Sequence, residues 1–276
     1  MGKTQKPFLL ATSLSLILTA CGGTATEPPL EQTTEPPAQQ PADQASGHVH
    51  WSYEGEGAPE HWGDISPDYA TCVNGKEQSP INIETAKVKP TGTGGGQAFT
   101  LSYKPTPFTV INNGHTIQAN PEDPHNIITI DSESYQLAQF HFHTPSEHQL
   151  NSQNFALELH LVHKNAQGHL AVLGVMLKEG AENPTIAKIW SGMPKTEDTE
   201  DVELVEPIDL NTLLPEDRKS FRYNGSLTTP PCSEGVKWTV LEQPIEMSRE
   251  QIAAYQAIFP MNARPVQPVK ERVVSY

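Results

Sequence analysis

The segment Gln139-Phe140-His141-Phe142-His143 alternates polar and aromatic side chains with a period of two residues, and residues 158–162, Glu-Leu-His-Leu-Val, alternate in the same way. Successive side chains of a β-strand point to opposite faces, so the first segment places His141 and His143 on one face and its two phenylalanines on the other. If the second strand lies beside the first, His160 joins that face. The two segments therefore predict a sheet that gathers three histidines on one surface.

Three histidines gathered in this way match a catalytic zinc site, which keeps a fourth position for water, whereas a structural zinc has a fourth protein ligand. A polar residue lies two positions before a histidine on each strand: Gln139 before His141, and Glu158 before His160. A metal-bound imidazole needs such a group to accept its other ring N–H. Three unrelated histidines are the alternative, but Gln139 and Glu158 would then be buried without partners, at roughly 1–3 kcal/mol each. We therefore predict zinc bound by His141, His143 and His160.

Six motifs follow one another along residues 50–276, and none would be specific alone. They are Pro59-Glu60-His61-Trp62, Gln78-Ser79-Pro80-Ile81-Asn82-Ile83, Asn112-Asn113-Gly114-His115, Phe140-His141-Phe142-His143-Thr144-Pro145-Ser146-Glu147-His148, Glu158-Leu159-His160-Leu161-Val162-His163 and Gly225-Ser226-Leu227-Thr228-Thr229-Pro230-Pro231-Cys232. In this order the chain resembles an alpha-class carbonic anhydrase of the bacterial, exported lipoprotein type. Its Thr-Pro-Ser-Glu-His at 144–148 stands where the vertebrate branch has a tryptophan and a longer loop, which favours the bacterial branch.

The resemblance implies a single, mainly β domain of the α+β kind, with a large, mostly antiparallel twisted central sheet, peripheral helices and the metal at the bottom of a cone-shaped cleft. Apolar runs rich in β-branched and aromatic residues independently predict strands at 108–111, 127–130, 157–162, 170–177 and 236–241. Two helices are expected, one beginning at Asn183-Pro184 and one beginning with a capping box of Ser248 and Gln251. A stretch of about 230 residues suits one domain with one sizeable core.

The resemblance also implies an activity, the zinc-dependent, reversible hydration of CO2 to bicarbonate and a proton. In that reaction a zinc-bound hydroxide attacks CO2, Thr228 accepts a hydrogen bond from the hydroxide and donates one to the buried Glu147, and His115 exports the proton. The family positions for substrate binding are Val162, Val172, Leu227, Thr228, Thr229 and Trp238, and those around the water chain are Tyr53, Asn113 and Gln118, where asparagine is commoner than Gln118.

Without the resemblance, these residues have ordinary structural interpretations. Thr228-Thr229 would be a proline-flanked turn, His115 an exposed turn histidine, and the apolar residues core packing. Two other functions also fit parts of the pattern. A catalytically silent, carbonic-anhydrase-like surface binding module usually lacks one or more zinc histidines, whereas this chain keeps all three. A zinc esterase would use the same hydroxide on activated esters, although a narrow apolar pocket favours CO2.

The N-terminal 47 residues predict export and a lipid anchor. Lys3 and Lys6 precede an apolar run that is too short to span a bilayer and suits a signal peptide at residues 1–20. Leu18-Thr19-Ala20-Cys21 resembles a lipoprotein cleavage site, so Cys21 is the expected lipidated residue; an ordinary signal peptide is the alternative. Residues 21–47 are rich in Pro, Thr, Gln and Glu and predict a disordered tether ahead of the domain at 48–276. We expect a lipid-anchored protein of the bacterial cell envelope, on its periplasmic or outer-surface side.

The cysteines agree with export. Of the three, Cys21 is assigned to the lipid, which leaves Cys72 and Cys232 as the one pair. An oxidising compartment would allow them to form a disulfide, and secreted relatives carry one at these positions. Two buried free thiols are the alternative.

The formal charge of −15 excludes some partners. The predicted signal peptide contains two lysines and the predicted tether four acids, so the domain keeps a charge of −13. Such an acidic protein repels nucleic acid and anionic lipid. The expected partner is therefore a small molecule, CO2 or bicarbonate, with no nucleic acid and with membrane contact only through the N-terminal lipid. A homodimer is compatible with these expected partners.

Overall fold

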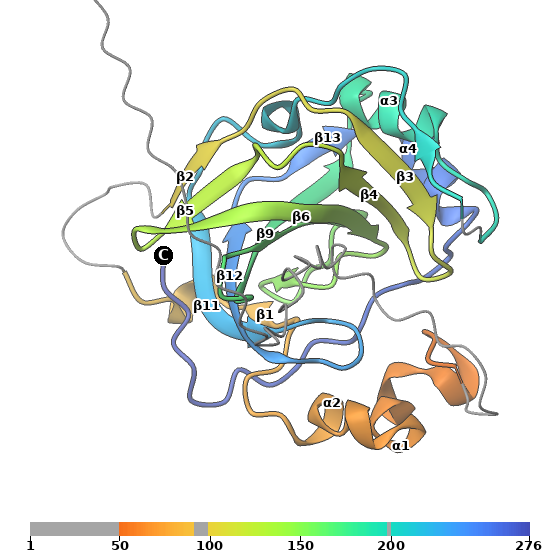
Figure 1. The fold of residues 1–276 in the computed structure, drawn as a ribbon. Coiled ribbons are helices and arrows are strands. Elements are labelled where there is room, and N and C mark those ends of the chain that lie inside the picture. The colour runs from red at the N-terminus through yellow and green to blue at the C-terminus, as the bar shows by residue number, and fades with distance from the viewer. Residues whose placement is uncertain (1–49, 91–98, 198–199) are drawn as a thin grey trace, which may run out of the picture. The chain divides into compact units, whose positions relative to one another are not determined.

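The computed structural model describes residues 50–90, 99–197 and 200–276, and a large twisted sheet makes up most of its regular structure (Figure 1). The hydrogen-bonded order of the main strands is β10 (Val202–Glu203), β3 (Phe108–Asn112), β4 (Ile117–Pro121), β6 (Glu133–His143), β8 (Leu157–Lys164), β9 (Leu170–Glu179), β12 (Glu234–Leu241) and β11 (Ser220–Ser226). The remaining strands of this sheet are β2 (Phe99–Ser102), which pairs with β5 (Ile127–Ile130), and β13 (Ile245–Met247), which pairs with β9; β5 also pairs with β6.

The direction of the strands confirms the predicted fold class. In this sheet β12 and β13 run parallel to β9, and the other pairs run antiparallel. A separate parallel pair joins β1 (Asn82–Ile83) to β7 (Gln149–Leu150). The five strands expected from sequence correspond to β3, β5, β8, β9 and β12. The protein is therefore mainly β, with a large, mostly antiparallel sheet.

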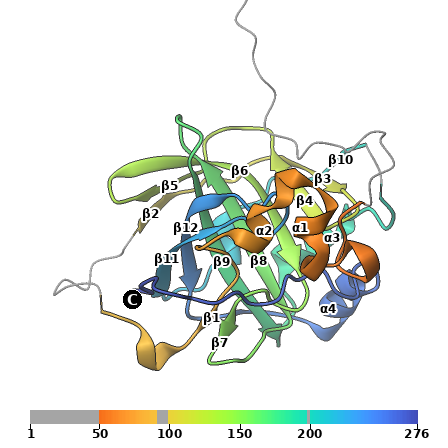
Figure 2. The same cartoon turned by 90° about the horizontal axis from the view of Figure 1, so that it is seen from below.

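Short helices lie around the sheet (Figures 1 and 2). They are α1 (Trp62–Ile65), α2 (Thr71–Asn74), α3 (Pro184–Ser191) and α4 (Arg249–Gln256), with the 3-10 turns η1 (Gly55–Gly57), η2 (Pro59–His61), η3 (Pro67–Tyr69), η4 (Thr85–Lys87) and η5 (Leu210–Leu213). Both helix starts expected from sequence are confirmed. The Asn183 side chain accepts hydrogen bonds from the first turn of α3, and Ser248 and Gln251 form the capping box of α4. Each cap satisfies backbone N–H groups that have no partner inside the helix.

Apolar side chains cover both faces of the sheet. On one face Phe140 and Phe142 of β6 belong to the largest core cluster, together with Ile189 of α3 and Tyr255 of α4. On the other face a smaller cluster surrounds Trp238 of β12. The histidines of β6 alternate with the two phenylalanines, so they face away from the larger core.

A β-bulge interrupts β6 between Leu137 and Gln139, where its register against β8 shifts. Before the bulge the core residues are Tyr135 and Leu137, and after it they are Phe140 and Phe142. The extra residue therefore reverses the alternation along the strand, as bulges do when one strand carries two residues against one on its partner. Because of this reversal, both halves of β6 contribute to the same core.

Several predictions concern residues outside the described ranges. These are the signal peptide at 1–20, the lipidated Cys21 and the tether at 21–47. Within the described ranges, none of the helices has the length and the apolar character needed to cross a bilayer.

The predicted disulfide between Cys72 and Cys232 is confirmed. It joins α2 to the loop between β11 and β12, across 160 residues of sequence, with the two Cα atoms 5.0 Å apart. A third apolar cluster surrounds it and includes Trp51, Tyr53 and Trp62. The bridge therefore fastens the N-terminal helices to the sheet.

Reduction of this disulfide should lower the free energy of unfolding by at most about 5 kcal/mol, because the bridge removes the freedom of a very long loop from the unfolded chain. Denaturant midpoints of oxidised and reduced protein test this, with Cys21→Ser as a control that keeps the bridge. Equal midpoints, or free thiols in the oxidised protein by non-reducing mass analysis, would contradict the expectation.

Candidate metal centre

Three imidazoles converge where β6 lies beside β8. The pairing register places His141 directly opposite His160, while His143 follows two residues later on the same face. The ring centroids are 4.9 Å apart for His141 and His143, 5.2 Å for His141 and His160, and 4.6 Å for His143 and His160. One ligand atom from each ring lies within 4.8 Å of the others. The predicted three-histidine cluster is therefore present.

Each of these imidazoles has a protein group against its outer nitrogen. His141 Nδ1 donates to Gln139 Oε1 at 2.8 Å, and His160 Nε2 lies 2.9 Å from Glu158 Oε1. Both partners were expected from their position two residues before the histidine. The third, the backbone carbonyl of Asn262, accepts from His143 Nδ1 at 2.7 Å and was not predicted. A carbonyl contact across 119 residues leaves no signal in the sequence.

These contacts fix which nitrogen of each ring remains for a metal. They leave Nε2 of His141, Nε2 of His143 and Nδ1 of His160. His143 Nε2 and His160 Nε2 are both buried without a hydrogen-bond partner among the described residues, but His160 Nε2 lies 2.9 Å from Glu158 Oε1, whereas His143 Nε2 is left as expected for an atom that ligates a metal. Burial lowers the pKa of His141 and of His143, which favours the neutral form that binds metals, whereas at His160 the effect of burial is outweighed by Glu158, which raises the pKa. The donor set therefore fits zinc.

A buried chain of hydrogen bonds continues outward from Glu158. His148 donates from its backbone N–H to Glu158 Oε2 at 2.8 Å and from Nδ1 to Oε1 at 2.7 Å. Its Nε2 accepts from the Tyr223 hydroxyl at 2.6 Å, and that hydroxyl lies 2.8 Å from Ser79 Oγ. Burial alone would raise the pKa of Glu158, but His148 and His160 bring it well below its usual range. His148 thus holds the Glu158 carboxylate in place against His160.

Glu147 lies beside His143 and His160 and is only 1% exposed. Its Oε1 accepts the backbone N–H of Arg264 at 2.8 Å. Its Oε2 lies 3.5 Å from His143 Nε2 and has no hydrogen-bond partner among the described residues. The hydrogen bond expected between Thr228 and Glu147 is therefore not formed here, although both side chains are buried. The carboxylate keeps one oxygen available.

The proposed substrate-binding residues surround the same region. Val162, Val172 and Trp238 belong to one buried cluster, and Leu227 packs against it. The Trp238 ring lies 4.9 Å from that of His160 between centroids. The turn that carries Thr228 is closed by Cys232, whose N–H donates to the carbonyl of Thr229 at 2.9 Å. An apolar cluster thus adjoins the imidazole of His160.

His115 lies in the turn between β3 and β4, with its ring stacked on Trp51 at 3.6 Å and on His50 at 5.0 Å between centroids. Burial, followed by the nearby His50, lowers the pKa of His115 to about 4. The Asn113 side chain holds the turn by accepting from the N–H groups of His115 and Thr116. Neither the stacking nor the lowered pKa was expected from sequence.

The other residues expected along the water chain lie near the same turn. Gln118 of β4 stands opposite His141 and accepts from Asn113 Nδ2 at 3.5 Å. Tyr53 is buried, and its hydroxyl has no hydrogen-bond partner among the described residues. Burial raises the pKa of Tyr53 well above its usual value, so the hydroxyl remains protonated. Gln118 and Asn113 thus lie between His141 and the His115 turn, whereas Tyr53 packs against Trp51 and Trp62.

Comparison with known proteins gives consistent results. A profile of the eukaryotic-type carbonic anhydrases matches residues 57–276. The carbonic anhydrase of Klebsiella pneumoniae is 48% identical over 230 residues, which cover 82% of this chain and 90% of the relative. That of a Nostoc species is 44% identical over 227 residues, covering 82% and 85%. The solved complex of the alpha-carbonic anhydrase of Thermovibrio ammonificans with sulfanilamide is 43% identical, with a TM-score of 0.79 over 83% of this chain and all of that chain.

Removal of the Gln139 side chain should weaken zinc binding roughly 10–100-fold, because His141 would lose the acceptor that fixes its orientation. Competition with a chromogenic chelator measures the affinity. Gln136→Ala is the matched control, since Gln136 is an exposed residue of the same strand. Equal zinc affinities of the Gln139→Ala and Gln136→Ala proteins would contradict the role given to Gln139.

Proposed function

The chain belongs to the eukaryotic-type, alpha-class carbonic anhydrases, and on that basis we propose that it binds one zinc ion through His141, His143 and His160 and hydrates CO2 reversibly to bicarbonate and a proton. The observation that carries the proposal is the convergence of three imidazoles whose outer nitrogens contact Gln139, Asn262 and Glu158. Three ligands leave a position open for chemistry. Zinc, when bound, supplies Lewis acidity that makes hydroxide available near neutral pH, a chemistry for which carbonic anhydrases are the standard example.

Thr228 and Glu147 are proposed to orient the attacking group. A hydroxyl can accept a hydrogen bond in a fixed direction only when another acceptor takes its own hydrogen. Glu147 Oε2 is the acceptor available for this purpose, since Oε1 already accepts the N–H of Arg264. Once this bond is formed, the Thr228 oxygen can accept a hydrogen bond from the attacking group in a fixed direction. Thr229 is proposed to contact bicarbonate.

The substrate wall is apolar because CO2 carries no charge and no dipole. Val162, Val172, Leu227 and Trp238 form this wall in the proposal, beside the imidazoles. Such a surface offers CO2 contact without hydrogen bonds and holds charged bicarbonate less well, which favours product release.

His115 is proposed to carry the proton to solvent through a water chain near Tyr53, Asn113 and Gln118. In its stacked position the ring is a poor base, because burial and His50 keep its pKa low. Turning away from Trp51 would return the ring to water and bring its pKa toward 6.5, the value suited to proton exchange near neutral pH. The shuttle therefore requires a moving ring.

We also propose export and lipid anchoring. The Cys72–Cys232 disulfide supports an oxidising compartment. In this proposal residues 1–20 are removed, Cys21 is lipidated, residues 21–47 form the tether and residues 48–276 form the catalytic domain, held at the cell envelope.

A stopped-flow assay of CO2 hydration, with and without a zinc chelator, tests the activity. Chelator-sensitive hydration is expected. A protein that hydrolyses activated esters but does not hydrate CO2 would favour the esterase, and a protein inactive in both assays would favour the silent binding module.

Thr228→Ala should retain zinc but lose roughly 10–100-fold in CO2 hydration, because hydroxide would no longer be held in the attacking orientation. Thr228→Ser is the control, since serine keeps the hydroxyl. His115→Ala should slow only proton export, so added imidazole should restore its turnover. Imidazole that rescues both alanine variants, or neither, would show that the two roles are wrongly assigned.

Cys21→Ser should release the protein from membranes without changing its activity, because a lipid anchor joined through a tether does not touch the metal centre. Membrane fractionation and the hydration assay measure the two properties. Continued firm membrane association of the variant would argue against lipidation at Cys21.

A further inference from the structure

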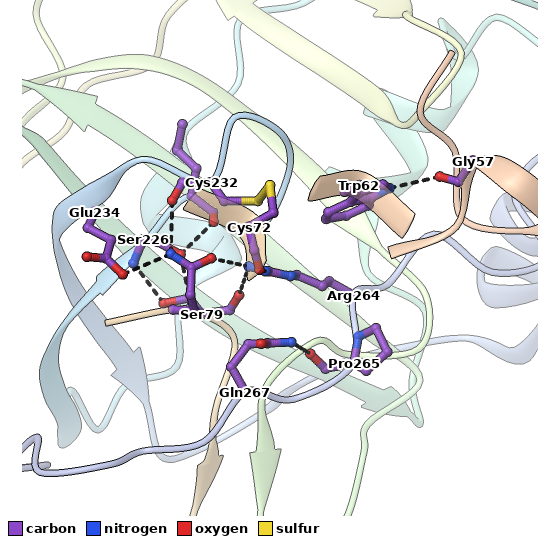
Figure 3. Close-up of a disulfide and its surroundings, with 12 residues drawn as sticks. Gly57, Trp62, Cys72, Ser79, Ser226, Cys232, Glu234, Arg264, Pro265 and Gln267 are labelled. Atoms are coloured by element: carbon purple, nitrogen blue, oxygen red, sulfur yellow. Dashed lines mark hydrogen bonds between the residues drawn. A yellow bond between two sulfur atoms is a disulfide. The ribbon is translucent and has the colours of Figure 1, made fainter. Parts of the chain in front are cut away.

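Arg264 lies in the segment that follows α4, and its side chain is 3% exposed. Figure 3 shows its guanidinium beside the disulfide. One terminal nitrogen donates to Gln78 Oε1 at 2.9 Å and to the Ser79 carbonyl at 2.7 Å, and the other donates to the Cys72 carbonyl at 2.7 Å. The guanidinium carbon also lies 5.5 Å from the centre of the Trp62 ring. The group is therefore held from several directions.

The acceptors of this guanidinium are all neutral. Among the described residues, no carboxylate lies within ion-pair distance of it. A buried cation without an anionic partner is expensive, and burial lowers the pKa of Arg264 to about 10. The anion that acts on it most is the buried Glu147, which favours its charged form. A neutral side chain would fill this space at lower cost, so the arginine needs a further explanation.

The backbone of the same residue contacts Glu147 beside the three histidines, so the fixed side chain holds a peptide group that reaches the candidate site. The N–H of Arg264 donates to Glu147 Oε1 at 2.8 Å. The other carboxylate oxygen, Oε2, lies 3.5 Å from His143 Nε2 and has no hydrogen-bond partner among the described residues. The N–H contact thus distinguishes the two oxygens, because it occupies one and leaves the other directed at the metal centre.

We propose that Arg264 is a positioning residue, whose guanidinium, fixed to Cys72, Gln78 and Ser79, holds its own N–H against Glu147 Oε1 and so keeps Oε2 available for the Thr228 hydroxyl. Three hydrogen bonds from a rigid planar group fix the side chain, and the side chain in turn restrains the peptide at 264. The inference rests on the proposed CO2 hydration, in which Glu147 orients Thr228.

A purely structural role for Arg264 is the alternative, and Arg272 offers a matched control. Arg272 also donates to several backbone carbonyls, among them those of Asn224 and Gln78, and lies 5.4 Å from the centre of an aromatic ring, that of Tyr223. Its own N–H, however, donates to the carbonyl of Val269. Loss of either arginine should destabilise the protein, but only loss of Arg264 should disturb Glu147.

The experiment compares Arg264→Ala, Arg264→Lys and Arg272→Ala in the zinc-loaded full chain. Activity is kcat/KM for CO2 per bound zinc, at an imidazole concentration that saturates proton transfer. The kcat/KM of Arg264→Ala should fall roughly 10–100-fold, the range typical when a residue that positions a metal ligand or its neighbour is removed. The kcat/KM of Arg272→Ala should remain near the wild-type value. Arg264→Lys should restore part of the loss, because an ammonium group keeps the positive charge but cannot donate several hydrogen bonds from one rigid plane as a guanidinium does.

Hydrogen exchange of the backbone amide at position 264 gives a readout independent of activity. Exchange should accelerate in Arg264→Ala, after correction for intrinsic rates, and should be unchanged in Arg272→Ala.

Equal kcat/KM for the two alanine variants, or an amide at 264 that stays protected in Arg264→Ala, would overturn the proposal. If Arg264→Ala does not fold, Arg264→Lys decides, and wild-type activity with wild-type exchange would then overturn it. If the wild-type protein does not hydrate CO2, the proposed function is contradicted. The exchange measurement would then still test whether the Arg264 side chain restrains its own amide.

Discussion

The antiparallel pairing of β6 with β8 is the constraint on which the rest of the molecule depends. The register that sets His141 opposite His160 on one face also sets Phe140 opposite Leu161 and Phe142 opposite Leu159 on the other. A slip of one residue would move the aromatic rings out of the core at the same time as it separated the imidazoles. Core packing and histidine geometry therefore enforce the same pairing, and the large apolar cluster indirectly holds the three-histidine cluster together.

The segment at 262–264 connects this pair of strands to the rest of the chain. The Asn262 side chain accepts from Thr144 N–H and donates to the carbonyls of Phe142 and His115, while its carbonyl holds His143. Arg264 then contacts Glu147 and the residues beside the disulfide. The side chains and backbone of this short segment thus contact β6, the turn that carries His115, and the N-terminal helices. Stability and site geometry are coupled through it.

Patterns that act within one strand or helix could be read from the sequence. Gln139 and Glu158 were identifiable because a period of two puts them on the face of the histidine they serve, and Ser248 with Gln251 marked a helix start. Asn262 and Arg264 were not, because their contacts with His143 and Glu147 use backbone groups, which every residue type offers, and join parts of the chain more than 100 residues apart. The stacking of His115 on Trp51 likewise depends on tertiary packing that no local pattern encodes.

The bulge in β6 falls where that strand changes its neighbour. Residues 133–136 pair with β5, whereas Phe140 and His141 pair with β4. The sheet therefore divides at the bulge into two branches, one of β2 and β5 and one of β3 and β4, and only the second carries the turn with His115. For protein engineering, the two branches are not equivalent. Insertions, labels or surface attachment at the turn between β5 and β6 would leave the histidine-bearing half of β6 in place, while the same changes between β3 and β4 would act directly on the turn that carries His115, the proposed proton shuttle.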